Sequence, residues 1–268
     1  MSYSRRTVTD GVTVMNKDLY DNLQDGIDES LKQKDGAGFH NANYRGKYLG
    51  TSLTTAQKQA ISSGKFTDMF IGDHWFLNGV TWRIAAFDYW LECGDTNLTT
   101  HHVVIVPDTH LYRHVMNDTN TTTGGYVGSK MYTEGLEQAK TLIKEAFGEA
   151  NILTHKEYLT NAVSNGYASA GAWYESQVEL MNENMVYGSA VFRPQNSLGA
   201  TIPKSDTVDK SILPLFQFRP DFISNQTNYW LRDVVSASCF AGVSSFGNPC
   251  YDNSGLSTGV RPVFGIKG

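Results

Sequence analysis

The sequence predicts an α+β domain, residues 36–268, preceded by a helical segment, residues 1–35. Three observations support this: an apolar stripe at helical spacing near the N-terminus, a strong hairpin signal at 74–84, and short apolar strands close to the C-terminus. Two helical patterns lie between the early and the late strands, an order typical of α+β rather than βαβ architecture. The 268 residues, 40% of them hydrophobic, can bury a sizeable core.

The charge balance excludes several classes of partner. A formal net charge of −5, with only 18% charged residues, does not favour nucleic acid, because phosphate binding needs clustered Lys and Arg. No apolar stretch reaches the length of a membrane span. The basic residues of segment 1–6 are not followed by an apolar run, as a secretory signal requires. We therefore expect a chain made in a cytoplasm and not inserted into a membrane.

The N-terminal segment predicts an amphipathic helix of about four turns, which Asn16 can cap. A helix this short is marginal alone, so its apolar stripe must pack on its own domain, on a symmetry mate or on another protein. We expect it to mediate assembly, and residues 34–38 to form a flexible linker. The assembly residues are those of the stripe: Leu19, Leu23, Ile27 and Leu31.

The next elements carry clear local signals. Thr54 and Gln57 form a capping-box pattern at the start of a short helix that stops at Gly64. Two strands, 74–77 and 80–84, flank Asn78-Gly79, the strongest signal for a two-residue hairpin turn. Residues 103–106 form a short, wholly apolar strand.

Two helices are expected after that strand. The first begins near Thr133 and ends at Gly148, with an apolar face from Leu136 to Phe147. The second begins at Thr154, with Glu157 completing a capping box, and ends near Gly166. Prolines prevent long elements over 187–228, and strands at 229–233 and 259–264 close the domain.

Several motifs together resemble a known family. They are residues 71–73, the hairpin 78–84, the Gly-rich run 124–129, Trp230-Leu231-Arg232 and the run 259–262. Their order resembles C-type-lectin-like domains of the sulfatase-modifying and phage-receptor kind. The N-terminal helix is similar to the leading segment of many tail-fibre and baseplate proteins. The resemblance implies a virion component that displays a receptor-reading domain.

The segment 234–258, between the last two strands, is the candidate binding surface. It contains no Glu, Lys, Gln, Met or Trp, and is rich in Ser, Gly and aromatic residues, the chemistry of an adaptable binding face. Variable segments in retroelement-diversified relatives obey the same exclusion. The alternative is a Gly/Ser-rich loop over a core. The candidate ligand-binding residues are Ser236, Ser238, Phe240, Ser244, Ser245, Phe246, Asn248, Tyr251 and Asn253.

No pattern predicts catalysis or a metal site. His110 and His114 could share a helix face, but no third ligand completes a zinc spacing. His101 and His102 open a strand and point to opposite faces. Neither a nucleophile elbow nor a phosphate-binding loop occurs. We expect no enzyme activity, no metal and no cofactor.

The cysteines and the large core candidates remain. Cys239 and Cys250 fall in the candidate surface and could pair, but free thiols are expected in a reducing compartment. A sulfatase-modifying-type oxidase, which uses a cysteine pair, is the lesser alternative function. Arginines and tryptophans of the family's frame are expected to be scaffold: Arg232, Arg261, Trp75, Trp82 and Trp230.

The expected function follows from the resemblance. It is a phage tail-fibre, baseplate or head-fibre protein, made in the bacterial cytoplasm and located in the virion. It would form a homo-oligomer, by preference a trimer, join other virion proteins through its N-terminal segment, and bind a glycan or protein receptor during adsorption. The alternative is a structural or decoration protein of the particle.

Overall fold

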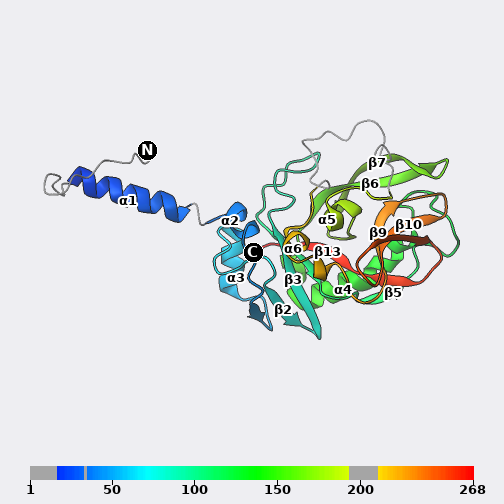
Figure 1. Cartoon of the computed structure of the whole chain (residues 1–268), viewed down its shortest axis with the longest axis horizontal. Coiled ribbons are helices and arrows are strands. Elements are labelled where there is room, and N and C mark those ends of the chain that lie inside the picture. The colour runs from blue at the N-terminus through cyan, green and yellow to red at the C-terminus, as the bar shows by residue number, and fades with distance from the viewer. Residues whose placement is uncertain (1–16, 33–34, 193–210) are drawn as a thin grey trace.

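The computed structural model describes residues 17–32, 35–192 and 211–268, without the side chains of residues 28–32. Two sheets, a long hairpin and short helices make up an α+β fold, as expected (Figure 1). The helices are α1 Lys17–Lys32, α2 Ala37–Asn41, α3 Thr55–Ser62, α4 Leu136–Phe147, α5 Glu183–Tyr187 and α6 Pro214–Phe218. The short helical turns are η1 Met131–Gly135, η2 Glu149–Asn151 and η3 Pro220–Phe222.

The strands form three groups. A six-stranded sheet has the order β1-β2-β3-β4-β13-β8, a five-stranded sheet has the order β11-β10-β9-β12-β5, and β6 pairs with β7 alone. The strands are β1 Tyr48–Gly50, β2 His74–Leu77, β3 Val80–Phe87, β4 Val103–Pro107, β5 Tyr112–His114, β6 His155–Ser164, β7 Tyr167–Ser176, β8 Val178–Leu180, β9 Tyr229–Val234, β10 Cys239–Val243, β11 Pro249–Asn253, β12 Thr258–Val260 and β13 Pro262–Ile266.

Aromatic rings fix α4 against the six-stranded sheet. The Phe147 ring lies 5.9 Å from the Trp75 ring, 5.8 Å from Trp82 and 5.5 Å from Phe264, each in an edge-to-face arrangement. All four side chains are buried. Such pairs stabilise the fold beyond the area that they bury. The expectation that Trp75 and Trp82 belong to the core is confirmed.

Strand β9 is buried on both faces, because it separates two hydrophobic clusters. Tyr229 and Leu231 pack in the larger cluster, whereas Trp230 and Val234 pack in a smaller one. Since neighbouring side chains of a strand point to opposite faces, a strand between two cores reads as a continuous apolar run. The expected burial of Trp230 is therefore confirmed as well.

Arg261 joins the two sheets. The chain leaves the five-stranded sheet at Val260 and enters the six-stranded sheet at Pro262. Between them the fully buried Arg261 donates from Nε to the carbonyl of Pro107 (2.9 Å) and from Nη1 to that of Phe222 (2.9 Å). Its Nη1 also reaches the Tyr229 hydroxyl, at 3.3 Å. The guanidinium thus supplies the donors that buried loop carbonyls require.

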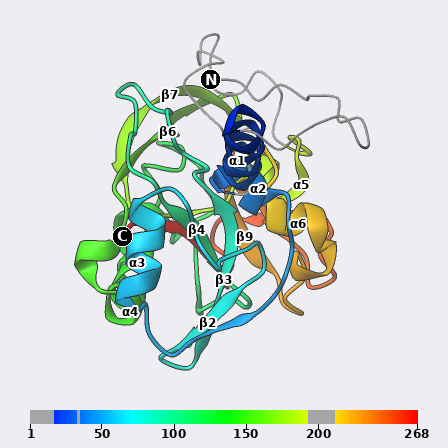
Figure 2. The same ribbon diagram turned by 90° about the vertical axis from the view of Figure 1, so that its left-hand side faces the viewer.

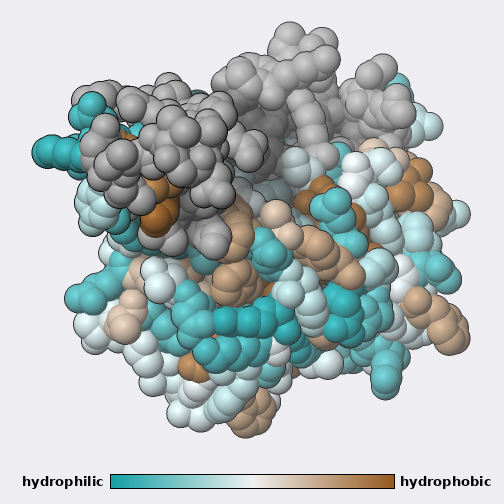
Figure 3. All heavy atoms as spheres, turned by 60° about the vertical axis from the view of Figure 1, so that its left-hand side comes forward, coloured by the Kyte–Doolittle hydropathy of each residue, from teal (hydrophilic) through white to brown (hydrophobic). Residues whose placement is uncertain are grey.

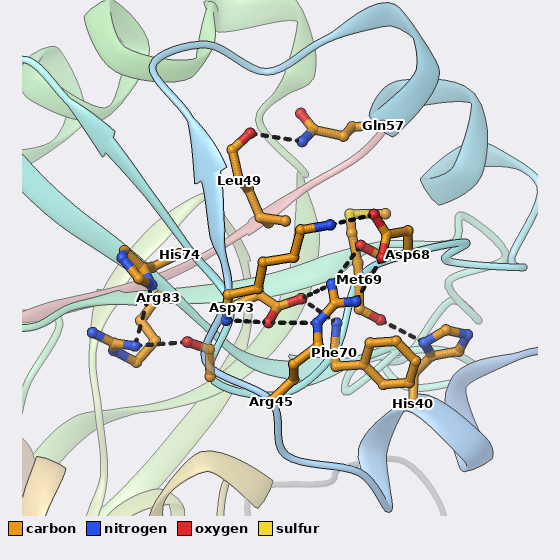
Figure 4. A network of polar contacts seen from close by, with 12 residues as sticks. His40, Arg45, Leu49, Gln57, Asp68, Met69, Phe70, Asp73, His74 and Arg83 are labelled. Carbon is orange, nitrogen blue, oxygen red and sulfur yellow. Dashed lines mark hydrogen bonds and ion pairs between the residues drawn. The ribbon is translucent and has the colours of Figure 1, made fainter.

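A second buried charge ties the segment before β1 to the six-stranded sheet (Figure 4). The Asp73 carboxylate is fully buried and accepts from Arg45 Nη2 (2.6 Å) and from the backbone amides of Lys47 (2.7 Å) and Phe70 (2.9 Å). Arg45 also bonds Asp68, at 2.5 Å. This network is charge-assisted and holds residues 45–47 beside the turn that precedes β2.

The short-range signals before residue 150 predicted their elements well. The Thr54–Gln57 capping box is present with both hydrogen bonds. Asn78 and Gly79 both take positive φ between β2 and β3, as the primed hairpin turn demands. Strand β4 is buried throughout, and α4 ends before Gly148.

The second helix, predicted from Thr154 to Gly166, is wrong. Residues His155–Ser164 form β6, which pairs in antiparallel fashion with β7 across Asn165-Gly166. Both turn residues have positive φ, 52° and 82°. The prediction relied on the apparent capping box and overlooked Asn165-Gly166, which is an Asn-Gly hairpin signal like the one at residues 78–79. Tertiary pairing and the turn outweighed the local helical pattern.

Helix α1 forms as predicted, and Figure 1 shows it extending away from the body of the molecule, whereas Figure 2 shows it from its end. Of the predicted assembly residues, Leu23 and Ile27 are 41% and 52% exposed, whereas Leu19 is only 8% exposed. Leu19 is thus largely covered, and its role in assembly stays a prediction. The side chain of Leu31 lies outside the described residues.

Two further expectations need correction or qualification. The predicted linker 34–38 is wrong at its end, because α2 begins at Ala37. The region 187–228 is irregular as expected where it is described, with only α6 and η3 as short helical pieces, and residues 193–210 lie outside the described residues. On the face shown in Figure 3, hydrophilic residues predominate among the coloured atoms and apolar ones form small patches.

We predict that Arg261→Met lowers the free energy of unfolding by about 3–5 kcal/mol, because it leaves several buried carbonyls without donors. Arg113→Met is the control, since Arg113 is exposed and donates to a single carbonyl, that of Ser257. It should cost less than about 1 kcal/mol. Denaturant unfolding of both variants measures the difference, and equal losses would contradict the role given to Arg261.

Candidate functional site

The candidate surface occupies one edge of the five-stranded sheet. Strand β10 pairs with β9 on one side and with β11 on the other, and β11 is the edge strand. The predicted ligand-binding residues therefore fall into four places: the β10–β11 turn, the edge strand itself, the interior strand β10 with Phe240, and the β9–β10 connection at the opposite end. The structure does not gather them into one cluster.

The β10–β11 turn presents Phe246 to solvent. Its ring is 86% exposed, although it sits in a turn closed by hydrogen bonds between Ser244 and Asn248 and between Gly247 and Ser244. Other elements hold the turn from behind: Ser224 Oγ donates to the carbonyl of Ser245 (2.7 Å), and the Tyr187 hydroxyl donates to that of Gly247 (3.1 Å). An aromatic ring on a fixed turn can bind with little loss of conformational entropy.

The edge strand adds Tyr251, which is 52% exposed. Its ring meets the ring of Phe192 edge to face, with centroids 5.0 Å apart. Phe240, by contrast, is fully buried in the smaller hydrophobic cluster. Its assignment to the binding surface is wrong: it pairs with Val234 of β9 and so lies between two strands, where alternation turns its ring inward.

The opposite end of the surface is polar. Ser236 and Ser238 lie in the β9–β10 connection, and Asn253 ends β11 beside Cys239. The Thr122 hydroxyl donates to the carbonyl of Ser236 at 2.8 Å. The β6–β7 turn also reaches this place, since a Cβ atom on Gly166 would lie 3.1 Å from the amide nitrogen of Ala237.

The sequence reasoning missed the neighbours of this polar end. Residues 119–123 pack against this polar end. The backbone amide of Thr121, a residue that was not predicted to belong to the surface, donates to Ser254 Oγ at 2.9 Å. Asn120 Oδ1 accepts from the amide of Gly255 at 3.1 Å. Exposed Tyr167 follows the β6–β7 turn. In the sequence, the Thr-rich run near residues 119–123 and the Asn165-Gly166 turn motif were the features that could have indicated these neighbours.

The histidines belong to structural contacts. His110 and His114 do not share a helix: His110 Nδ1 lies 2.8 Å from the Thr227 hydroxyl in a loop, and His114 ends β5. His101 and His102 both contact Asp88, the first partly exposed and the second buried. Burial lowers the pKa of His102 to about 3, so its ring is neutral. Within the described parts of the chain, no cluster of three metal-binding side chains occurs.

Cys239 and Cys250 form no disulfide, as expected. The register of β10 and β11 places Cys239 and Cys250 on opposite faces, since Cys239 pairs with Asn253 and Cys250 with Gly242. Burial, with a smaller effect from the Asp252 carboxylate, raises the pKa of the Cys250 thiol to about 11. A protonated thiol is a poor nucleophile.

A buried charge network lies under the β6–β7 hairpin. Arg232 Nη2 donates to Glu157 Oε2 at 2.9 Å, and His155 Nε2 lies 3.2 Å from Glu157 Oε1. Burial opposes the charge of Glu157, but Arg232 and His155 outweigh it and keep the pKa of this carboxyl well below its usual range. Arg232 is therefore scaffold, as expected.

Glu179 lies next to this network, and its pKa is shifted in the opposite direction to that of Glu157. Ser176 Oγ donates to its Oε1 at 2.7 Å, and the side chain is fully buried. Burial raises the pKa of Glu179 to about 7, because Arg232 only partly offsets the loss of hydration. Near neutral pH, this carboxyl is therefore partly protonated.

Comparisons with protein-family models, with curated protein sequences and with solved structures give no match. Among the helices of the described ranges, none has the length and apolar character needed to cross a bilayer. Any function is therefore argued from the residues and their geometry.

We predict that Phe246→Ala and Tyr251→Ala each change the free energy of unfolding by less than about 0.5 kcal/mol, since both rings are exposed. Phe240→Ala should cost about 3–5 kcal/mol, because it empties a core site. Thermal and denaturant unfolding of the three variants measures these differences. A large loss for Phe246→Ala would show that the ring is covered in the folded protein.

We predict that Glu179→Gln removes a pH dependence of stability. The folded protein keeps this proton up to about pH 7, whereas the unfolded chain releases it near the ordinary value of 4.5. Unfolding thus releases a proton in this window, and stability falls as pH rises through it. At pH 8 the free energy of unfolding of the variant should exceed that of the parent by up to about 3 kcal/mol, whereas at pH 4 the two proteins should be equally stable. A constant difference from pH 4 to 8 would contradict the assignment.

Proposed function

We propose that this chain is a phage virion component whose C-type-lectin-like domain binds a host-surface ligand during adsorption. The motif order that resembles the family supports the proposal, as does the placement of the candidate segment. Within that segment, β11 is the edge strand of the sheet, and the β10–β11 turn carries the exposed Phe246.

One observation carries the proposal: the exposure of Phe246 on a turn held from two sides. Ser224 and Tyr187 both donate hydrogen bonds to backbone carbonyls of this turn, so the turn holds the exposed Phe246 ring in a fixed position. Tyr251 extends the exposed aromatic surface along β11, and exposed Asn248 lies between them. Rigid aromatic anchors flanked by small polar residues are typical of binding surfaces.

Helix α1 supports assembly. Tyr20, Leu23 and Ile27 are exposed on a helix that extends from the body, and a helix of this length gains most of its stability from contacts with other elements. We propose that this stripe packs in a homo-oligomer, by preference a trimer, and connects the domain to other virion proteins. A structural or decoration protein would use the same stripe. The receptor-binding role and the structural role are therefore distinguished by whether the chain blocks adsorption of the phage to its host.

The adsorption test uses the full chain as a competitor for the phage that carries it, on its host cells. The chain should block adsorption, and Phe246→Ala and Tyr251→Ala should each weaken binding to the cells by about tenfold, or about 1–2 kcal/mol. Tyr48→Ala and Phe76→Ala are matched controls, since these rings are similarly exposed on the other sheet. A chain present in the particle that neither binds cells nor blocks adsorption would support the structural alternative.

We predict that Leu23→Glu combined with Ile27→Glu converts the oligomer to a monomer, because charges on the stripe oppose its burial. Gln24→Glu is the control on an exposed polar position of the same helix. Light scattering after size-exclusion chromatography measures the mass. An oligomer unchanged by the double substitution would place the subunit contacts elsewhere.

A further inference from the structure

Two adjoining hollows form a groove at the open end of the β6–β7 hairpin, away from its turn. The first, of about 280 Å³, lies between α4 and the end of β7, and the second, of about 210 Å³, lies under the loop 96–100. Thr154 and Glu175 line both hollows. The two spaces therefore meet at this pair of residues and can hold parts of one extended ligand.

The lining of the groove is rich in hydroxyl and amide groups, with a smaller apolar surface at one end. The half-buried Tyr132 contributes apolar surface to the first hollow. Hydroxyl and amide groups line the rest: Thr96, Asn97, Thr99, Thr100, Thr154, Ser176 and Gln177. Such groups exchange hydrogen bonds with a ligand that carries both donors and acceptors.

The charges of the groove are balanced. Lys140 bonds Glu137 at 2.7 Å, and Lys156 lies 3.8 Å from Glu175. Because each lysine already faces a carboxylate, the groove does not present an unpaired cation to a phosphate or a carboxylate ligand. The lining thus favours a ligand without net charge.

One buried polar atom in the wall of the second hollow, His155 Nδ1, has no hydrogen-bond partner among the described residues. The other ring nitrogen of this histidine, Nε2, lies 3.2 Å from Glu157 Oε1. An unpaired buried polar atom is costly, and a ligand hydroxyl that reaches this wall would satisfy it.

We propose that this groove binds a neutral oligosaccharide, with adjoining sugar units in the two hollows. A sugar ring offers hydroxyl donors and acceptors around its rim, and an apolar face that suits the ring of Tyr132. The inference rests on the proposed function only for the source of the glycan, a cell surface. The groove is lined by residues other than those of the β10–β11 surface.

The test is a titration of the full chain, followed by backbone amide shifts, with neutral hexoses, N-acetylhexosamines and their disaccharides. Hexuronic acids and inorganic phosphate are the charged comparison. We expect shifts at Thr99, Thr154 and Gln177 with a Kd of about 1 mM for a monosaccharide, and at least about tenfold tighter binding of a disaccharide. No shifts with any neutral sugar, or equal shifts with the charged compounds, would overturn the proposal.

Variants locate the site. Thr99→Trp, which fills the second hollow from an exposed position, and Glu175→Ala should each weaken the disaccharide by about tenfold or more. Glu149→Ala is the matched control: Glu149 is as exposed as Glu175, 74% against 73%, and also faces one lysine. Binding that Thr99→Trp and Glu175→Ala leave unchanged would overturn the assignment to this groove.

Failure here is distinguishable from failure of the proposed function. Phe246→Ala should leave sugar binding unchanged, since its turn lies on a different sheet edge. Adsorption blocked by the chain without any sugar binding would overturn the groove assignment alone. Sugar binding by a chain that does not block adsorption would support the groove and count against the receptor-binding role.

Discussion

The fold depends on a buried arginine at the point where the chain passes from one sheet to the other. Arg261 gives its donors to carbonyls of β4 and η3 and to the Tyr229 hydroxyl of β9, so one side chain satisfies groups from three elements. Without these donors, the short crossing between β12 and β13 would bury unpaired carbonyls. The relative position of the two sheets therefore follows from a local requirement for hydrogen bonds.

Strand β9 connects the core to the candidate binding surface, because it pairs with β10, which in turn pairs with β11. Because β9 is buried on both faces, its register cannot slip without moving Trp230 and Leu231 between two cores. Strand β10 inherits the register, and β11 forms the free edge. The exposed Phe246 is thus carried on a turn whose base is fixed by core packing, so the rest of the sheet holds this ring in a defined position.

The carboxyl groups of Glu157 and Glu179 show how neighbouring buried sites reach different charge states. Glu157 touches both Arg232 and His155 and stays ionised. At Glu179, burial outweighs Arg232 and the hydroxyls of Ser176 and Tyr126, so this carboxyl is partly protonated near neutral pH. Paired charge stabilises one site and protonation relieves the other. A partly neutral carboxyl in the wall of the sugar groove suits a ligand without charge.

The sequence by itself determined the elements whose signals are local: α1, the Thr54–Gln57 cap, the β2–β3 hairpin, β4 and α4. It also indicated that Phe246 and Tyr251 lie in a surface segment, whereas their exposure was decided by tertiary contacts. Only the tertiary structure decided that 155–164 is a strand, that Phe240 is core, and that the groove forms at Thr154 and Glu175. The physical reason is that caps and turns act over a few residues, whereas burial, strand pairing and pockets depend on segments distant in the chain.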